Sequence, residues 1–263
     1  MNNTADNYSP TLSNAGQAPS VTVSVQNSSN NTCSAEIAAE RPLTIYINKQ
    51  ETVTLLTLGT HPELLALGYL WNQGLFDNLH NIRSVCVDWN KGSASIQTSE
   101  PLTDNNSVIN HQAGPARVST GANPVISRTE ISTLLERISD CNQLYRRIGG
   151  VHGCAIFHGA KLVYFVEDIG RHNATDIVAG YMWLNGIYGG DKKFYATGRL
   201  TSEIVLKLSR MGIPTAISRS SITHLGLELA QELGITLIGR AKGRQFVVYN
   251  GSITIPDATK DGN

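Results

Sequence analysis

The sequence predicts an α/β protein with a mostly parallel sheet and helices on its faces. In the second half of the 263-residue chain, apolar strand-like runs alternate with segments whose apolar residues recur at helical spacing. Capping-box sequences, which begin helices, occur at residues 60–63 and 127–130. Strand–helix alternation favours parallel pairing because each helix returns the chain across the sheet to start a strand in the same direction.

Residues 39–99 are expected to form a small ββαββ lobe. Two apolar runs at 43–48 and 53–59 flank a polar KQE break and predict a pair of strands. The capping box at 60–63 begins a helix. Two further runs, 84–89 and 93–99, are joined by Asn90-Lys91-Gly92, which is typical of a hairpin turn.

The second half predicts a longer series of elements. The capping box Ser127–Glu130 begins a helix that runs to about Arg147. The expected elements that follow are strands 149–157 and 161–168, helix 174–185, strand 192–198, helix 202–211, strand 213–219, helix 222–233, and strands 235–241 and 245–251 around a Lys242-Gly243 turn.

The remaining segments are expected to lack a core. Residues 1–38 are rich in Asn, Ser and Thr and cannot offset their ordering entropy by apolar burial, so they predict a disordered tail. Residues 100–127, with three prolines, predict a linker or mobile loop. The α/β domain then spans 128–255, and 256–263 form a flexible tail.

Composition excludes several classes of protein. The net charge is zero and the isoelectric point is about 7.0, so no basic field attracts nucleic acid. None of the four cysteines is spaced C-x-x-C from another, which argues against a disulfide framework or a cysteine zinc site. No apolar run approaches the ~20 residues of a membrane helix, and the first basic residue is Arg41, unlike a secretory signal. A reducing cytoplasm is the expected location.

Polar residues gather where the predicted strands end. Glu167, Asp168, Arg171 and His172 stand between a strand-like and a helix-like apolar run. Parallel sheets bind ligands at the carboxyl ends of their strands, and helix N-termini there favour anions. Each of the four ends carries an arginine: Gly170-Arg171-His172, Gly198-Arg199, Ser218-Arg219-Ser220-Ser221 and Gly239-Arg240-Ala241-Lys242-Gly243-Arg244. If these ends share one edge, they predict a phosphate-binding pocket.

Simpler interpretations exist for individual residues. Arginine is a common rim residue at solvated strand ends. Asn173 is also a helix-capping residue, and Asp176 suits a helix dipole in the first turn. Among Ser220, Ser221 and Thr223, at least one is explained by capping alone. Glu167 and Asp168 have no assigned role beyond orienting Arg171 or His172.

Two histidines and one cysteine near the strand ends also have simpler interpretations. His172 is expected to contact an anion or order its loop rather than bind metal. His152, in an apolar strand, is more typical of a satisfied core histidine than of a functional one. Cys154 lies two residues on and would share its face; a buried, inert thiol is the default for it.

Several motifs together resemble the formate dehydrogenase accessory sulfurtransferase family. They are IGGVHGCAIF, VEDIGRHNATDIVAG, TGRLTSEIVLKLSRMGIP and SRSSITHLGLELAQELGITLIGRAKG, with ERPLTIYIN and HPELLALGYLWNQGLF in the small lobe. The resemblance covers about residues 40–250 in order and with compatible spacing.

This resemblance implies a specific function. Proteins similar to this one have a deaminase-like three-layer α/β/α core and act as cytoplasmic homodimers. They accept sulfur from a cysteine desulfurase and pass it to the molybdenum bis(molybdopterin guanine dinucleotide) cofactor before its insertion into formate dehydrogenase. GDP is a fragment of that cofactor. The family's cofactor-binding loop falls on Arg240, Ala241, Lys242, Gly243, Arg244 and Gln245.

The sequence departs from the family at its sulfur-carrying motif. Members carry a persulfide on a C-G-x-C pair between lobe and main domain, where this chain has Thr120 and Asn123. Sulfur carriage needs a thiolate, so the relay is expected to be altered while cofactor binding is retained. Cys154 and Cys86 are expected to be buried in strands, Cys141 lies in a helix and Cys33 in the tail. Cys154 and Cys33 are weak candidates to carry sulfur in place of the missing cysteine pair.

Two other functions remain open. A zinc hydrolase of the deaminase type needs H-x-E and P-C-x-x-C. Here the first motif reads His172-Asn173-Ala174, and the second reads Thr197-Gly198-Arg199 without a cysteine, so no metal is expected. The other alternative is a non-enzymatic cofactor-binding chaperone or regulator that uses the pocket without sulfur transfer.

Overall fold

The computed structural model describes residues 8–99 and 126–254. The chain divides into two compact units. Unit 1 comprises the described residues within Met1–Gly114, Leu144–His152 and Val166–Ile187. Unit 2 comprises those within Pro115–Gln143, Gly153–Phe165 and Tyr188–Asn263. The expected boundaries of 39–99 and 128–255 differ from this division, because two later segments group with unit 1.

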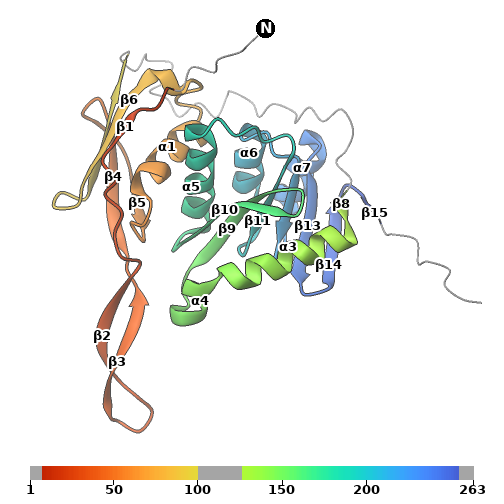
Figure 1. Ribbon diagram of the computed structural model, residues 1–263, viewed down its shortest axis with the longest axis horizontal. Helices are drawn as coiled ribbons and strands as arrows, with labels where there is room; N and C mark the ends of the chain where they lie inside the picture. The colour runs from red at the N-terminus through yellow and green to blue at the C-terminus, as the bar shows by residue number, and fades with distance from the viewer. Residues whose placement is uncertain (1–7, 100–125, 255–263) are drawn as a thin grey trace, which may run out of the picture. The chain divides into compact units, whose positions relative to one another are not determined.

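Unit 1 contains the expected ββαββ lobe (Figure 1). Its five-stranded sheet has the order β1-β6-β7-β4-β5. The elements are β1 (Thr11–Leu12), β4 (Arg41–Ile47), β5 (Gln50–Thr57), α1 (Pro62–Asn72), η1 (Leu79–Asn81), β6 (Ile82–Asp88) and β7 (Ser93–Thr98). Alternate residues of the interior strand β4, including Leu43 and Ile45, are buried. Period-two burial is what a sheet with one covered face produces.

Helix α5 (Arg171–Leu184), expected within the α/β domain, belongs to unit 1 and packs on α1. Glycines permit the close approach of the two helices. A Cβ atom on Gly68 of α1 would lie 1.7 Å from the carbonyl oxygen of Asp176. A Cβ on Gly180 of α5 would lie 2.0 Å from the carbonyl oxygen of Leu64. Both backbones therefore touch at a point that no larger residue can occupy.

The expectation of disorder for residues 1–38 does not hold from residue 8 onward. Strands β2 (Ser20–Gln26) and β3 (Thr32–Ala38) form an antiparallel hairpin (Figure 1). The preceding segment is held by polar contacts: Glu63 accepts hydrogen bonds from Ser13 Oγ at 2.5 Å and Ala15 N at 2.7 Å. Trp89 Nε1 donates to Ala15 O at 2.6 Å. Hydrogen bonds to distant residues thus supply order that apolar content alone does not predict. Residues 1–7 lie outside the described part.

Unit 2 is built on a six-stranded sheet of order β10-β9-β11-β12-β13-β14. Its strands are β9 (His152–His158), β10 (Lys161–Asp168), β11 (Lys192–Ala196), β12 (Thr215–Ser218), β13 (Thr236–Lys242) and β14 (Gln245–Asn250). The central strands β11, β12 and β13 are parallel, whereas β9 and β14 pair antiparallel. The sheet is therefore mixed, with a parallel centre, and not mostly parallel as expected, because hairpins rather than helices connect its outer strands.

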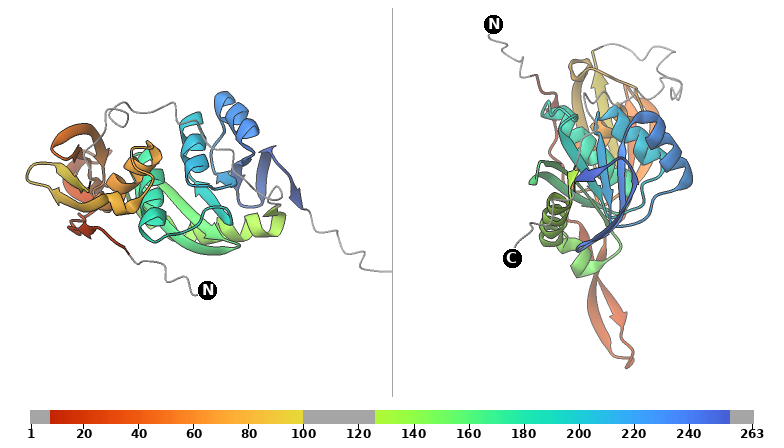
Figure 2. Two further views of the ribbon diagram at one scale, coloured as in Figure 1. Left: turned by 90° about the horizontal axis from the view of Figure 1, so that it is seen from above. Right: turned by 90° about the vertical axis from the view of Figure 1, so that its right-hand side faces the viewer.

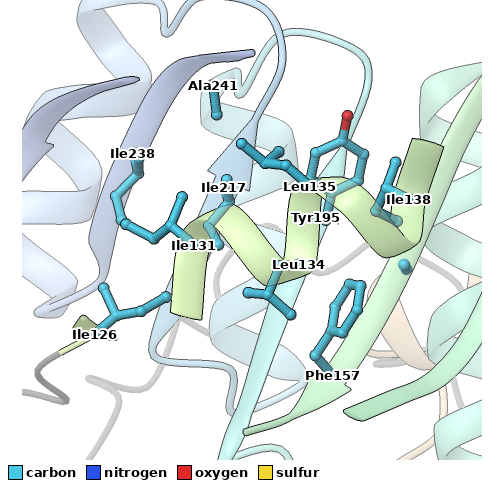
Figure 3. Close-up of a cluster of buried hydrophobic side chains, with 11 residues drawn as sticks. Ile126, Ile131, Leu134, Leu135, Ile138, Phe157, Tyr195, Ile217, Ile238 and Ala241 are labelled. Carbon is cyan, nitrogen blue, oxygen red and sulfur yellow. The ribbon is translucent and has the colours of Figure 1, made fainter. Parts of the chain in front are cut away.

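Helices cover both faces of this sheet, giving three α/β/α layers (Figure 2). Helix α3 (Arg128–Cys141) lies on one face, where Ile131, Leu134 and Ile138 form a core with Phe157 and Tyr195 (Figure 3). Helices α6 (Ser202–Arg210) and α7 (His224–Leu233) pack together on the other face. The α/β fold class is confirmed.

The remaining elements of the described chain are short. Strand β8 (Ile126–Ser127) pairs in parallel with β15 (Ile253–Thr254). The helix expected over 128–147 is interrupted at Asn142, after which α4 (Gln143–Ile148) follows. Its predicted start is confirmed, since Ser127 Oγ accepts a hydrogen bond from Glu130 N at 3.0 Å. No helix in residues 8–99 or 126–254 is both long and apolar enough to cross a bilayer.

Candidate functional site

The carboxyl ends of the three parallel strands of unit 2 meet at one edge of the sheet. Ser218 of β12 lies in register with Ala196 of β11, and Ile238 of β13 lies in register with Ile217 of β12. The segments that leave these strands are Gly198-Arg199, Arg219-Ser220-Ser221 and Gly239-Arg240. Three of the four arginine-bearing strand ends predicted from the sequence therefore share an edge, as expected for parallel strands.

Main-chain hydrogen bonds tie these segments to one another. Arg240 N donates to Ser220 O at 2.7 Å, and Arg219 N donates to Ala196 O at 3.0 Å. Leu200 N donates to Ser221 O at 3.2 Å. Main-chain hydrogen bonds thus order these loops in large part.

The hydroxyl of Ser218 is part of this scaffold. Its side chain is fully buried, donates to Gly198 O at 2.7 Å and accepts from Ser220 N at 2.9 Å. A hydroxyl that is engaged on both sides positions the two loops. The predicted contact of Ser218 with a ligand therefore remains a prediction, whereas its role in joining the loops is observed.

Arg240 adopts an unusual backbone conformation. Its φ is 52°, in the left-handed region that non-glycine residues rarely occupy. The pairing of β13 with β14 is irregular between Gly239 and Lys242. A Cβ on Gly239 would lie 2.9 Å from the Tyr249 ring and 3.3 Å from Ser220 O, so glycine permits the close approach of the Ser220 loop. Strained residues and bulges of this kind occur often at functional sites.

The cationic side chains at this edge reach solvent. Arg199, Arg219, Arg240 and Lys242 are all exposed. Within the described residues, no carboxylate forms an ion pair with Arg199, Arg240 or Lys242. Burial raises the pKa of Tyr195 to about 12, and the nearby charge of Arg219 acts in the opposite direction. Three like charges at one edge, those of Arg199, Arg240 and Lys242, favour a multivalent anion.

The hydroxyl residues of the Ser220 loop divide between capping and other roles. Thr223 caps α7, since its Oγ1 accepts from Gly226 N at 3.3 Å. Capping thus accounts for Thr223, while Ser220 and Ser221 are partly exposed and do not cap this helix. Ala241 is buried in the core beneath α3, so only its main chain faces the loop residues.

The far end of the predicted cofactor loop borders a separate hollow in unit 2. Gly243, with φ of 58°, forms the turn between β13 and β14. Arg244 and Gln245 then line a cavity of about 460 Å³ together with Arg128, Phe246 and Ile253. Two guanidinium groups facing one hollow make a second position at which an anion can bind.

Arg171, His172 and Asn173 belong to unit 1 and are described within it. Arg171 is the first residue of α5, and its Nε is buried without a hydrogen-bond partner among the described residues. Burial lowers the pKa of His152, and the charge of Arg171 lowers it further. A buried Nε without a partner at a helix start is compatible with the predicted anion contact.

Asn173 is engaged inside unit 1. Its Nδ2 donates to Leu56 O at 2.6 Å and to Asp168 Oδ1 at 2.9 Å, while the N-cap of α5 is Gly170. The helix begins three residues before the predicted residue 174, so Asp176 lies beyond its first turn and binds Asn72 Nδ2 at 2.7 Å. Among the described residues, no group of three or more His, Cys, Asp or Glu side chains is arranged to hold a metal.

The two acidic residues without an assigned role have structural partners. Asp168 is fully buried and accepts four hydrogen bonds, from Thr57 Oγ1, Leu58 N, Gly170 N and Asn173 Nδ2. Glu167 accepts from Leu144 N and Tyr145 N at the start of α4. Burial raises the pKa of Glu167, and these two hydrogen bonds oppose that shift. Both carboxylates therefore fasten segments together.

The four thiols differ in accessibility. Cys154 is fully buried, as expected, and lies in register with Ala196. Cys86 is exposed, so the expectation that it is buried is wrong; it points from the uncovered face of the unit 1 sheet. Cys33 is also exposed and lies in β3, and Cys141 is partly exposed. Thr120 and Asn123 lie outside the described residues.

Two polar residues near the site were not predicted from the sequence to belong to it. Arg128 shares a cavity with Arg244, but the only signal in the sequence was its position inside a capping box. Thr201 precedes α6, and its buried Oγ1 has no hydrogen-bond partner in the described part of the chain. Its position directly after the Gly198-Arg199 end was the available signal.

Comparison with known proteins places this geometry in a family. The profile of the FdhD/NarQ family matches residues 38–255. The chain belongs to the FdhD/NarQ family. Among its FdhD relatives, the sulfur carrier protein FdhD of Bacillus pumilus is 33% identical over 231 residues, covering 81% of this chain and 88% of that protein. The sulfur carrier protein FdhD of Listeria innocua is 31% identical over 235 residues, covering 82% and 90%.

A solved structure supports the same assignment to the FdhD/NarQ family. The crystal structure of a formate dehydrogenase accessory protein from Desulfotalea psychrophila matches with a TM-score of 0.73 and 28% identity. The match covers 89% of this chain and 97% of that chain. The likeness therefore extends over nearly the whole fold. The β2–β3 hairpin, by contrast, lies at and before the first residue of the family match.

Proposed function

We propose that this FdhD/NarQ protein is an accessory factor in formate dehydrogenase maturation that binds the molybdenum bis(molybdopterin guanine dinucleotide) cofactor as its cargo. The carboxyl edge of the unit 2 sheet is the proposed binding site. Arg199, Arg219 and Arg240 contact the pyrophosphate groups, and the Lys242–Gln245 turn completes the site. By family resemblance, the protein acts as a homodimer in the cytoplasm.

The observation that carries this proposal is the position of Arg240. Its left-handed backbone is fixed by the 2.7 Å hydrogen bond from its N–H to Ser220 O, so its guanidinium is presented from an ordered loop. Strain at an exposed arginine contributes nothing to packing, and it is retained most readily where a ligand uses the side chain. Guanidinium groups bind phosphate oxygens through paired hydrogen bonds.

Binding of GDP, a fragment of the cofactor, tests the site. We expect saturable binding in a calorimetric titration of the full chain, weakened about tenfold or more in Arg240→Ala and Lys242→Ala because each charge-assisted contact contributes about 1.5–3 kcal/mol. Arg137→Ala is the matched control, since Arg137 is an exposed arginine on α3, away from the strand ends. Equal affinities in all four proteins would end the proposal.

The sulfur-relay part of the family function is proposed to be altered. Thr120 and Asn123 occupy the aligned positions of the family's cysteine pair, and neither a hydroxyl nor an amide holds a sulfane sulfur. The buried thiol of Cys154 is a poor acceptor, because persulfide transfer needs direct approach of two sulfur atoms.

Mass spectrometry checks this proposal. After incubation with a cysteine desulfurase and cysteine, we expect little stable gain of one sulfur atom on the chain. The exposed thiols of Cys33 and Cys86 define the variants to compare, Cys33→Ala and Cys86→Ala, with Cys154→Ala for the buried thiol. A stoichiometric mass gain that one of these substitutions removes would show that a different cysteine has taken over the relay.

A second function, a non-enzymatic cofactor chaperone or regulator, is favoured by the same Thr120 and Asn123. Complementation of a strain that lacks its normal accessory factor separates the two. The wild-type chain and a Thr120→Cys/Asn123→Cys double variant are compared for restored formate dehydrogenase activity. Activity with the double variant alone supports a chaperone derived from a sulfur carrier, whereas activity with the wild type supports a retained relay.

A further inference from the structure

A cavity of about 640 Å³ lies on the uncovered face of the unit 1 sheet, apart from every residue in the proposed function. Side chains of β4, β6 and β7 and of their connecting turns form it, including Tyr46, Lys49, Arg83, Lys91, Ser95 and Thr98. The strands alternate here: Ile45 and Ile47 are buried in the core, while Tyr46 between them is partly exposed. The volume falls in the range of small-molecule sites.

The charges around this cavity are predominantly positive. Lys49, Arg83 and Lys91 line it, and no carboxylate does. Two acids lie nearby: Asp88 contacts Lys91 Nζ at 3.5 Å with both side chains well exposed, and Glu51 accepts a weak hydrogen bond from Tyr46 at 3.4 Å. Lys49 and Arg83 form no ion pair with any described residue. Their charges are therefore available to an anion.

Lys49 is held in a conformation that favours glycine. Asn48 and Lys49 form the two-residue turn between β4 and β5, with φ values of 48° and 73°. Turns with two positive φ values favour Asn followed by Gly, because a side chain is crowded at the second position. A lysine there is costly to the turn and brings an ammonium group to the rim of the cavity.

Asn48 fixes this turn against β7. Its Nδ2 donates to Thr98 Oγ1 at 2.5 Å, its Oδ1 accepts from Thr98 N at 3.1 Å, and its own N–H donates to Ile96 O at 2.9 Å. These three hydrogen bonds of Asn48 fix the conformation of the turn, so the strained Lys49 is held in place. Backbone strain of this kind persists where the side chain has a use.

We propose that this cavity binds a phosphorylated small molecule of nucleotide size, with its phosphate groups between Lys49, Arg83 and Lys91 and its organic part against Tyr46. Cations together with the exposed hydroxyl of Ser95 suit phosphate oxygens. The aromatic ring of Tyr46 suits an apolar body.

An exposed thiol beside the cavity reports on its occupancy. Cys86 lies directly opposite Ser95 across the β6–β7 pair, so both side chains share the uncovered face. Cys33, also exposed, lies in β3 outside this sheet and serves as an internal reference. Alkylation by iodoacetamide, followed by mass spectrometry of the full chain, measures both thiols in one sample.

The experiment titrates the full chain with ADP, chosen because it has a nucleotide's size but not the guanine of the cofactor. We expect saturable binding and at least about threefold slower alkylation of Cys86, with Cys33 unchanged, since a bound ligand covers the neighbouring thiol. Arg83→Ala and Lys49→Gly are expected to weaken binding about tenfold, as loss of a charge-assisted contact does. Lys49→Gly also relieves strain, so its Tm is expected to rise by about 1–4 °C, which excludes unfolding as the cause.

A substitution in unit 2 serves as the control for binding at the unit 1 cavity. Arg137→Ala, which removes an exposed arginine of α3 in unit 2, should leave ADP binding and Cys86 protection unchanged. Inorganic pyrophosphate is titrated in parallel: weaker binding than ADP supports the contact with Tyr46. ADP binding that Arg240→Ala abolishes while Lys49→Gly and Arg83→Ala retain it would overturn the proposal, as would unchanged alkylation of Cys86 at saturating ADP.

Discussion

Replacing Gly68 with alanine tests whether the backbone contact between α1 and α5 determines the stability of unit 1. The added Cβ would lie 1.7 Å from the carbonyl oxygen of Asp176, far below the 3.0 Å that real Cβ atoms respect. The helices must therefore separate by more than about 1 Å. That movement also stretches the 2.7 Å hydrogen bond from Asn72 Nδ2 to Asp176 Oδ1, which joins the two helices.

The magnitude follows from two opposing effects. Overpacking that displaces backbone costs about 3–5 kcal/mol, at the upper end of single substitutions. Alanine in place of glycine within a helix returns about 1 kcal/mol. The free energy of unfolding is therefore expected to fall by about 2–4 kcal/mol, which lowers Tm by about 5–15 °C for a chain of this length.

Tryptophan fluorescence during urea unfolding reports this change locally. All three tryptophans, Trp71, Trp89 and Trp183, lie in unit 1, and the rings of Trp71 and Trp183 stack at 5.9 Å between α1 and α5. Gly186→Ala is the matched control: it has positive φ but no atom within 4 Å of the added Cβ, so strain alone should cost about 1 kcal/mol.

The sign of the change in the free energy of unfolding distinguishes two explanations. Helix propensity alone predicts that Gly68→Ala is more stable than the wild type, whereas the backbone contact predicts a large loss. A Gly68→Ala variant as stable as the wild type would therefore refute the reasoning. The double variant with Gly180→Ala should lose less than the sum of the two single variants, because the helices are already apart.

Three further predictions follow from the same structure. Asp168→Asn replaces a carboxylate oxygen that accepts two hydrogen bonds with an NH2 group, which can only donate. The free energy of unfolding, measured with urea, should fall by about 2–5 kcal/mol, whereas the exposed Asp140→Asn should change it very little. The pKa of His152 is lowered from its ordinary 6.5 in the folded chain, so the unfolded state takes up the proton first as the pH falls. The free energy of unfolding of the wild type should therefore decrease, relative to that of His152→Asn, as the pH falls through and below 6.5. Parallel plots of unfolding free energy against pH for the two proteins would contradict this. Ser127→Ala removes the cap of α3 and should cost about 1 kcal/mol in thermal unfolding, and an unchanged Tm would show that the cap is dispensable.

Much of the fold followed from periodicity and capping. The helix expected from Ile204 and Leu208 is α6, with both residues buried, and the capping box at Ser127 begins α3. The segment from residue 8 to residue 17 was missed because its partners, Glu63 and Trp89, are about 50–75 residues away. Composition measures apolar content, but this segment is ordered by hydrogen bonds to the lobe.

The candidate site was predictable in part. Strand–helix alternation places Arg199, Arg219 and Arg240 at one edge, because parallel strands end together. Nothing in the order of residues indicates that Arg240 is left-handed or that Ser218 joins two loops, since both depend on the neighbouring strand. From the sequence, Asp168 had no role beyond orienting Arg171 or His172, yet its buried carboxylate accepts four hydrogen bonds, two of them from Thr57 and Leu58, which lie 111 and 110 residues away.

The sequence by itself determined the spacing of strands and helices, the arginines that follow the strands, and the absence of cysteine at positions 120 and 123. Only the tertiary structure decided which surfaces are covered. Cys86 and Cys154 both lie in apolar strands, and yet one thiol is exposed and the other is buried. A period-two pattern assigns side chains to two faces, but whether a helix packs over a given face depends on the rest of the chain.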